Sequence, residues 1–165
     1  MIIIVEGIDR VGKTTLCKKL SDVLGAPIIK HSSMFPIDRM DNANETDKIT
    51  KMLDIYSITR PLVIFDRLHL TDFVYGICDR NYDIKDAFSN LEVVENELKK
   101  YECIVIYVVS ENVQMSSEEH GKNLRCHEQY FNIIFDKSEL YKLKTSYSKL
   151  DETVKTINNI LNEEV

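Results

Sequence analysis

The sequence predicts a three-layer α/β fold built on a parallel sheet of about five strands. Unbroken apolar runs at 2–5, 62–65 and 103–109 are typical of parallel strands that are buried on both faces. The segments between them carry apolar residues at helical spacing. Strands that alternate with helices in this way favour parallel pairing through right-handed crossovers.

The remaining elements follow from local signals along the chain. Short strands are expected at 28–30 and at 146–150. Helices are expected at 13–24, 46–59, 68–78, 84–101 and 128–143, with a last helix capped by Asp151. The polar residues 112–126, interrupted by Gly121, are the candidate for a mobile lid.

The first apolar run leads directly into the pattern Gly7-x4-Gly12-Lys13-Thr14. Two glycines let successive backbone N–H groups converge into an anion-binding nest at the start of a helix. Lys13 would reach the β- and γ-phosphates of a nucleotide, and the Thr14 hydroxyl would ligate Mg²⁺. The residues predicted to bind the nucleotide are Gly7, Ile8, Asp9, Arg10, Val11, Gly12, Lys13, Thr14 and Thr15.

A charged pair, Asp66-Arg67, follows the second apolar run. In open α/β sheets, ligands bind at the carboxyl ends of the strands. We therefore expect Asp66 and Arg67 to enter the same crevice as the glycine loop.

Size and charge limit the classes of function. The 165 residues fit a single domain spanning 1–165. A net charge of −6 argues against a nucleic-acid scaffold or a polybasic membrane anchor and favours a small-molecule partner. Because residues 1–5 are too short for a signal peptide or a membrane span, we expect a cytoplasmic protein.

Neither the cysteines nor the histidines form a recognisable metal motif. We expect reduced thiols, with a disulfide as the minority alternative, at Cys17, Cys78, Cys103 and Cys126. We expect ordinary, partly exposed side chains with no catalytic part at His31, His69, His120 and His127.

The loop, read as Val-Glu-Gly-Ile-Asp-Arg-Val-Gly-Lys-Thr-Thr, resembles that of thymidylate kinases, and Phe65-Asp66-Arg67 is similar to the Asp-Arg motif of that family. The resemblance implies a P-loop kinase fold and an enzyme that uses ATP and Mg²⁺ to phosphorylate a nucleoside monophosphate. It implies that Lys13 and the loop amides hold the ATP phosphates, and that Thr14 and Asp66 serve the metal.

The same resemblance implies roles on the acceptor side. Asp9 would approach the acceptor sugar or phosphate, and Arg67 would clamp the acceptor phosphate. Arg10 resembles the loop arginine that stabilises charge during transfer in one branch of the family. That branch lacks the basic lid residues that the other branch uses. The lid candidate here offers only Lys122 and Arg125, which suits that branch.

A second kinase interpretation stays open. Lys30-His31-Ser32-Ser33 stands where thymidylate kinases usually carry Arg-Glu-Pro. Residues 66–72 also look like the Glu-Arg-Ser…Ser-Asp pattern of deoxynucleoside kinases, in which case Asp66 is the general base for a sugar hydroxyl. Aromatic residues that would stack on a base under either interpretation are Phe35, Phe73 and Tyr75.

A third interpretation is a nucleotide-binding protein without kinase turnover. Against it, the sequence contains neither a guanine-reading Asn-Lys-x-Asp segment nor an Asp-x-x-Gly switch after a strand. A homodimer is compatible with the sequence. The base and sugar of the acceptor stay open at this stage.

Overall fold

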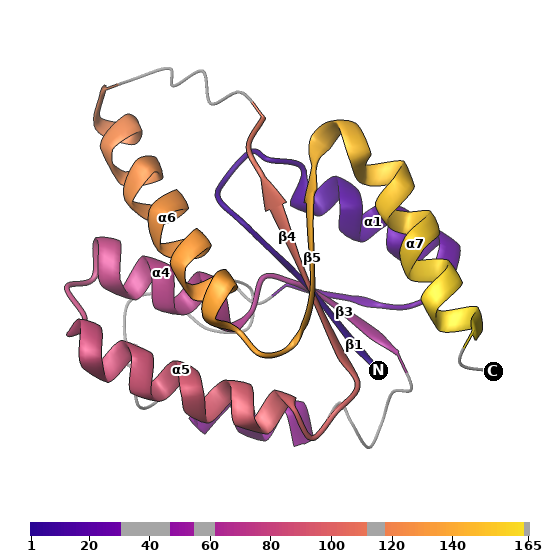
Figure 1. Cartoon of the computed structure of the whole chain (residues 1–165), viewed down its shortest axis with the longest axis horizontal. Coiled ribbons are helices and arrows are strands. Elements are labelled where there is room, and N and C mark those ends of the chain that lie inside the picture. Colours follow the sequence, from indigo (N-terminus) through magenta and orange to yellow (C-terminus); the bar gives the residue numbers. More distant parts are fainter. Residues whose placement is uncertain (31–46, 55–61, 112–117, 164–165) are drawn as a thin grey trace.

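The computed structural model describes residues 1–30, 47–54, 62–111 and 118–163, with only the backbone described at 118–123 and 163. Its centre is a parallel five-stranded sheet in the order β2-β3-β1-β4-β5 (Figure 1). The strands are β1 (Ile2–Glu6), β2 (Ile28–Lys30), β3 (Val63–Asp66), β4 (Cys103–Val109) and β5 (Tyr141–Ser146). The predicted α/β class and the parallel sheet are confirmed.

Strand β1 lies at the middle of the sheet, where its residues are buried on both faces. It pairs with β3 on one side and with β4 on the other. Val5 is the register partner of Asp66, and Lys30 on β2 is also opposite Asp66. The carboxyl ends of three neighbouring strands therefore meet beside the glycine loop.

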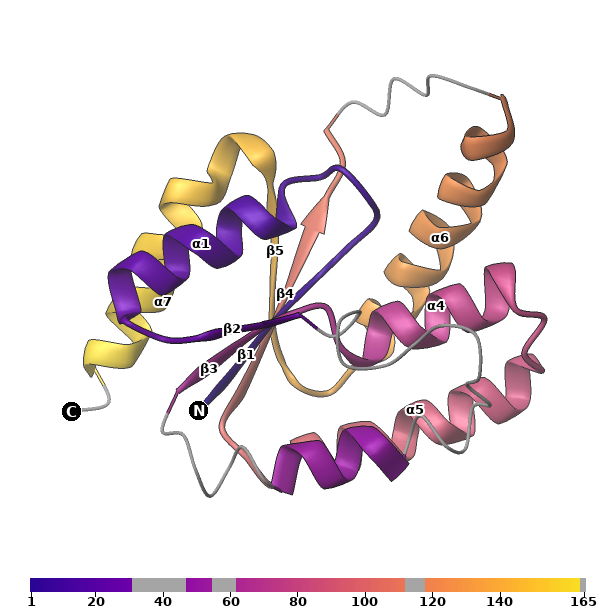
Figure 2. The same cartoon turned by 180° about the vertical axis from the view of Figure 1, so that it is seen from behind.

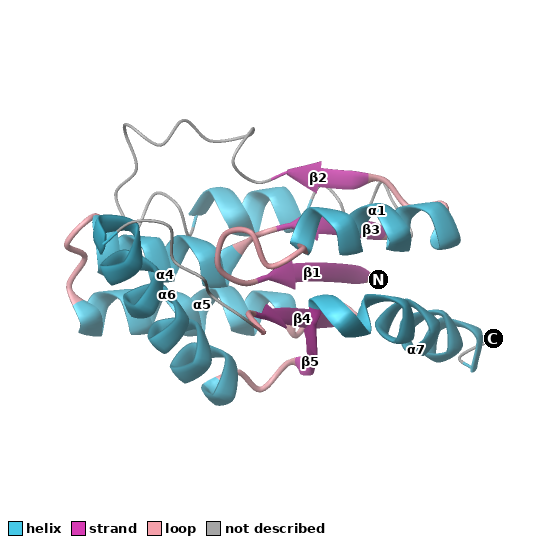
Figure 3. Cartoon of the chain, turned by 90° about the horizontal axis from the view of Figure 1, so that it is seen from above, coloured by secondary structure: helices cyan, strands magenta, loops and turns pink. Residues whose placement is uncertain are grey.

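Helices cover both faces of the sheet. Helices α1 (Lys13–Leu24) and α7 (Leu150–Glu163) lie on one face, as the two opposite views show (Figures 1 and 2). The other face carries α4 (His69–Asp79), α5 (Ile84–Leu98) and α6 (Glu118–Lys137), together with the helical residues 47–54. The view from above shows the strands side by side in the order β2, β3, β1, β4 and β5 (Figure 3).

The end of the chain differs from the prediction. Helix α6 ends at Lys137 rather than continuing to 143, and the last strand is Tyr141–Ser146 rather than 146–150. Parallel pairing with β4 puts Thr145 opposite Val108 and Ser146 opposite Val109. A short 3-10 turn, Tyr147–Lys149, then leads into α7, so Asp151 lies in the first turn of that helix rather than capping it.

The polar stretch proposed as a lid is partly helical. Residues 118–126 form the first turns of α6, and Gly121 lies within the helix rather than at a hinge. Residues 112–117 lie outside the described part of the chain. The part of the candidate lid that the structure describes is therefore helical, and its role as a lid stays a prediction.

Two expectations about reactive side chains are also corrected. Cys78 on α4 and Cys126 on α6 form a disulfide, whereas Cys17 and Cys103 are free. His69 and His127 are buried rather than partly exposed, with 0% and 5% of their surface accessible. Both corrections arise from the packing of α4 against α5 and α6, which the spacing along the chain does not report.

In the described part of the chain, we find no helix with the length and apolar character needed to cross a bilayer.

Candidate active site

The glycine loop takes a backbone path that its two glycines permit. Gly7 has a φ of 139°, and a Cβ there would lie 2.4 Å from the carbonyl oxygen of Val108. Gly12 has a φ of 100° and precedes the first residue of α1. Close approach to β4 and a left-handed turn at the helix start therefore both depend on a missing side chain. The resulting nest of N–H groups faces the carboxyl edge of the sheet.

Lys13 is the first residue of α1, yet it is only 5% exposed. Its ammonium group folds back over the loop and donates a hydrogen bond to the carbonyl of Ile8. Burial, followed by the nearby Arg67 charge, lowers the pKa of Lys13 from 10.5 to about 8. The carboxylates of Asp9, Asp66 and Glu6 offset this lowering only in part, so a phosphate group entering the loop would stabilise the charged ammonium further.

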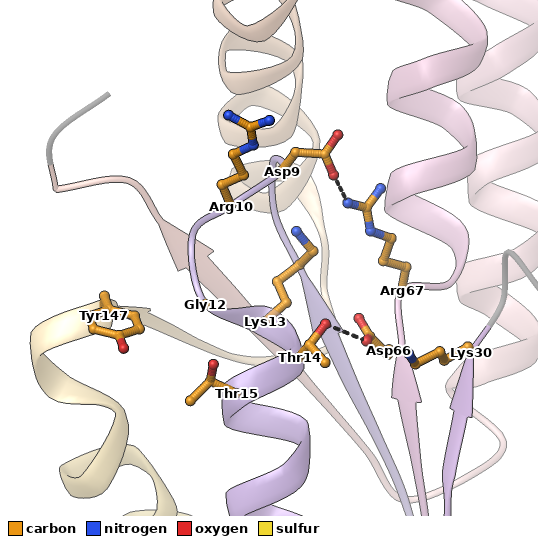
Figure 4. A pocket seen from close by; sticks show the side chains of 10 residues that line it. All are labelled: Asp9, Arg10, Gly12, Lys13, Thr14, Thr15, Lys30, Asp66, Arg67 and Tyr147. Atoms are coloured by element: carbon orange, nitrogen blue, oxygen red, sulfur yellow. Dashed lines mark hydrogen bonds and ion pairs between the residues drawn. The ribbon is translucent and has the colours of Figure 1, made fainter. Parts of the chain in front are cut away.

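Thr14 and Asp66 meet beside Lys13. The Thr14 hydroxyl donates a 3.0 Å hydrogen bond to Asp66 Oδ2, although the two residues lie on α1 and β3 (Figure 4). A hydroxyl and a carboxylate are the oxygen donors that suit Mg²⁺, which is held in such sites by few protein ligands together with phosphate. The pair fits the predicted metal role, and Mg²⁺ held there would neutralise phosphate charge.

Arg67 forms the opposite wall. Its guanidinium donates a hydrogen bond to Asp9 in the loop and another, at 3.3 Å, to the Tyr75 hydroxyl on α4. Burial alone would lower the pKa of Arg67, but Tyr75 and Asp9 outweigh it and raise that pKa. Burial would likewise raise the pKa of Asp9, yet the Arg67 charge holds it below its ordinary value. Both groups therefore stay charged at neutral pH.

The backbone of Arg67 is also held in place, because its N–H group donates a 3.0 Å hydrogen bond to the carbonyl of Val5 on β1. Its φ is 73°, in the left-handed region that few non-glycine residues occupy. The fully buried Glu6 at the end of β1 accepts hydrogen bonds from the backbone N–H groups of Leu68 and Leu70 and from the Thr71 hydroxyl. Glu6 was not among the predicted site residues, although its place directly before Gly7 is visible in the sequence.

These groups line one cavity of about 620 Å³. It is lined by Asp9, Arg10, Gly12, Lys13, Thr14, Thr15, Lys30, Asp66, Arg67 and Tyr147. Figure 4 shows Lys30 and Arg67 on one side of Lys13, and Tyr147 on the other side. Tyr147 is 62% exposed, and its ring lies against Gly12. Sequence reasoning missed Tyr147, because the expected strand at 146–150 concealed the turn that presents it.

The predicted loop residues differ in their positions. Arg10 lies at the exposed tip of the loop, where its guanidinium points away from Lys13 and Asp66 (Figure 4). Ile8 and Val11 point into the core, so only their backbones are available to a ligand. Phe35 lies outside the described residues, as does the side chain of Lys122. Phe73 is buried in the core, whereas Tyr75 borders the site through Arg67.

The chain is similar to known proteins in structure but not in sequence families. No family model and no curated protein matches the sequence. Among solved structures, the YorR protein of Bacillus subtilis, in complex with phosphorylated GDP, has a TM-score of 0.78 at 25% identity, covering 99% of this chain and 97% of that one. The chain has the P-loop nucleotide kinase fold.

Two further structures share this kinase fold over their whole lengths. Thymidylate kinase of Ehrlichia chaffeensis has a TM-score of 0.63 at 16% identity, with 98% of each chain covered. Deoxyadenosine kinase of M. mycoides has a TM-score of 0.61 at 16% identity, with 100% of each chain covered. The resemblance to thymidylate kinases in the loop is thus confirmed at the level of the fold.

Proposed function

We propose that this protein catalyses phosphoryl transfer from ATP to a nucleoside monophosphate. The observation that carries the proposal is the placement of two separate cationic groups in one cavity, Lys13 in the loop and Arg67 across from it. A monophosphate kinase must hold the phosphates of a donor and of an acceptor, whereas a nucleoside kinase needs only the first. Phosphoryl transfer relies on positioning and charge neutralisation more than on a strong base.

The donor is assigned to the loop side of the cavity. The N–H groups of the loop, with Lys13, would bind the β- and γ-phosphates of ATP, and Thr14 and Asp66 would hold Mg²⁺ beside them. The exposed ring of Tyr147 lies at the same end of the cavity and offers a surface for stacking the base.

The acceptor is assigned to the side of β2 and β3. Arg67 presents a planar guanidinium suited to two-point binding of a phosphate, and Asp9 holds it at one edge. Lys30 extends from the end of β2 towards Asp66 and adds a second positive charge (Figure 4). Arg10 would reach the transferring group only if the loop tip or its side chain turned inward.

A coupled ADP-release screen tests the proposal. The purified chain would be offered ATP, Mg²⁺ and each common ribo- and deoxyribonucleoside monophosphate, including guanine nucleotides because YorR holds phosphorylated GDP. We expect turnover with at least one monophosphate and none with the matching nucleoside. ADP release that no monophosphate accelerates above the ATP-only rate would exclude the proposal.

A nucleoside kinase is the second candidate, favoured by the shared fold of deoxyadenosine kinase and by the position of Asp66 at the end of β3. In that case the Asp66 carboxylate would take the proton of a 5′-hydroxyl. The same screen with nucleosides separates the two candidates, because only the second predicts faster turnover with a nucleoside than with its monophosphate.

A further inference from the structure

Helices α4 and α6 are linked by a disulfide and by polar contacts next to Tyr75, the partner of Arg67. Cys78 and Cys126 form a disulfide between them. One residue further along each helix, Asp79 Oδ2 and His127 Nε2 lie 2.9 Å apart. The imidazole of His127 also stacks on the ring of Tyr75, with the ring centres 4.2 Å apart and the planes inclined by 21°. We call these five residues the α4–α6 clasp.

The clasp contacts the proposed acceptor wall through Tyr75. The hydroxyl of Tyr75 accepts the 3.3 Å hydrogen bond from Arg67, and the guanidinium carbon lies 5.5 Å from the centre of the same ring. Tyr75, Cys78 and Asp79 are spaced three and four residues apart, so they share one face of α4. Contacts therefore run without a break from Asp79 through His127 and Tyr75 to Arg67 and Asp9.

The packing leaves Tyr75 dependent on α6. Tyr75 is only partly buried, and its ring stacks on His127, which is 5% exposed. His127 in turn is held by Asp79 and by the covalent bond at its neighbour Cys126. A ring that loses its stacking partner gains rotational freedom, and a hydrogen bond to a charged group weakens when its acceptor moves.

We propose that the α4–α6 clasp positions Arg67, with His127 as its positioning residue, and that the Cys78–Cys126 disulfide makes acceptor affinity respond to thiols. This inference rests on the proposed function, because it gives Arg67 the acceptor phosphate. With the disulfide formed, Tyr75 holds the guanidinium in the orientation that receives the phosphate. With both thiols reduced, α6 separates more freely from α4 and acceptor affinity falls.

The chemistry is thiol–disulfide exchange with a small disulfide such as oxidised glutathione. One cysteine thiolate attacks the small disulfide and releases its first thiol, leaving a mixed disulfide. The second cysteine then displaces the other small thiol and closes the Cys78–Cys126 bond. The two cysteines lose two electrons, the small disulfide gains them, and both protons leave on the released thiols. Excess dithiothreitol drives the reverse reaction.

The experiment compares acceptor KM, ATP KM and kcat for the oxidised and the dithiothreitol-treated protein, with alkylation and mass spectrometry reporting which cysteines are bonded. We expect reduction to raise acceptor KM about tenfold, as for a weakened hydrogen bond to a charged group, with a smaller change in kcat and in ATP KM. Cys126→Ser should show the raised KM and no response to dithiothreitol. Cys103 lies at the start of β4, at the end of the sheet opposite the site. Cys103→Ser should therefore behave as the unaltered protein.

Variants of His127 test its part separately. In the oxidised protein, His127→Ala should raise acceptor KM, whereas His127→Phe, which keeps a flat ring behind Tyr75, should restore most of the affinity. The melting-temperature increase on adding ATP should be equal in all these variants, which shows that each one folds. Equal effects on acceptor KM and ATP KM, or free thiols at Cys78 and Cys126 after air oxidation, would overturn the proposal.

A readout without turnover separates this inference from the proposed function. The Nε–Hε NMR signal of Arg67, assigned by its loss in Arg67→Lys, should shift on reduction of the unaltered protein and stay fixed in Cys126→Ser. A shift without transfer to any monophosphate would retain the clasp and reject the kinase proposal. Transfer to a monophosphate with an Arg67 signal insensitive to reduction would reject the clasp alone.

Discussion

The hydroxyl of Thr14 and the carboxylate of Asp66 are 52 residues apart in sequence and 3.0 Å apart in space. This bond joins the first turn of α1 to the end of β3, so the glycine loop and the Asp66-Arg67 pair form one site. It also gives Asp66 a partner on the donor side of the cavity.

Removing either oxygen from the Thr14–Asp66 pair should weaken the same metal site. We expect Thr14→Ala and Asp66→Asn each to lower kcat, by roughly a hundredfold as for the loss of one major charge-stabilising group, and to raise the Mg²⁺ concentration needed for half-maximal rate. The double variant should lose little more than either single one. Thr14→Ser, which keeps the hydroxyl, is the matched control. Additive losses would contradict a shared site.

Arg67 should affect the acceptor far more than the donor. Arg67→Lys keeps the positive charge but loses the planar fork that contacts Asp9 and Tyr75. We expect acceptor KM to rise about tenfold or more, with ATP KM nearly unchanged. Steady-state kinetics with each substrate varied in turn measures both constants. An equal rise in the two would place Arg67 on the donor side instead.

The buried ammonium of Lys13 predicts a pH dependence. Because its pKa is lowered from 10.5 to about 8, the free protein loses this positive charge as pH rises through about 8. ATP affinity, measured by calorimetry, should therefore decline above that pH. Lys13→Arg, whose guanidinium keeps its charge, should show a flatter profile. Equal slopes in the two proteins would assign the decline to another group.

The lowered pKa of Lys13 also makes the stability of the fold depend on pH. Between a pH of about 8 and a pH of 10.5, the unfolded chain binds a proton at Lys13 that the folded chain has lost. The contribution of Lys13 to the free energy of unfolding therefore rises with pH across this window. Below a pH of about 8 its contribution does not change with pH. Urea unfolding at several pH values, compared between the unaltered protein and Lys13→Arg, measures the contribution.

Tyr147 should affect the donor nucleotide selectively. Replacing it by alanine removes the exposed ring at the loop end of the cavity, and base stacking on an aromatic ring is worth roughly 1–3 kcal/mol. We expect Tyr147→Ala to raise ATP KM about tenfold while acceptor KM stays constant. Tyr147→Phe keeps the ring and should resemble the unaltered protein. A Tyr147→Ala variant with normal ATP KM would remove this residue from the site.

The loop glycine should be more sensitive to substitution than the glycine after α1. Gly7→Ala adds a Cβ 2.4 Å from a backbone oxygen of β4, whereas Gly25, also at positive φ, has open space around it. We expect Gly7→Ala to lower the free energy of unfolding by roughly 2–5 kcal/mol and Gly25→Ala by about 1–2 kcal/mol. Urea denaturation measures both. Equal losses would mean that backbone strain alone decides the cost.

The sequence alone determined four of the five strands, the phosphate loop and the position of Asp66-Arg67. These features depend on local properties, because β-branched runs bury as parallel strands and glycines allow the turn that gathers N–H groups. The expected strands at 2–5, 62–65 and 103–109 differ from β1, β3 and β4 by at most a residue at their ends.

Only the tertiary structure decided the start of α6, the position of β5, the exposed ring of Tyr147 and the α4–α6 clasp. Each depends on partners far apart in the chain: β5 forms where β4 offers an open edge, and Cys78 meets Cys126 because α4 packs on α6. Periodicity records which face of a segment is apolar. It does not record which distant segment covers that face, so the contacts around Arg67 emerge only once the chain is folded.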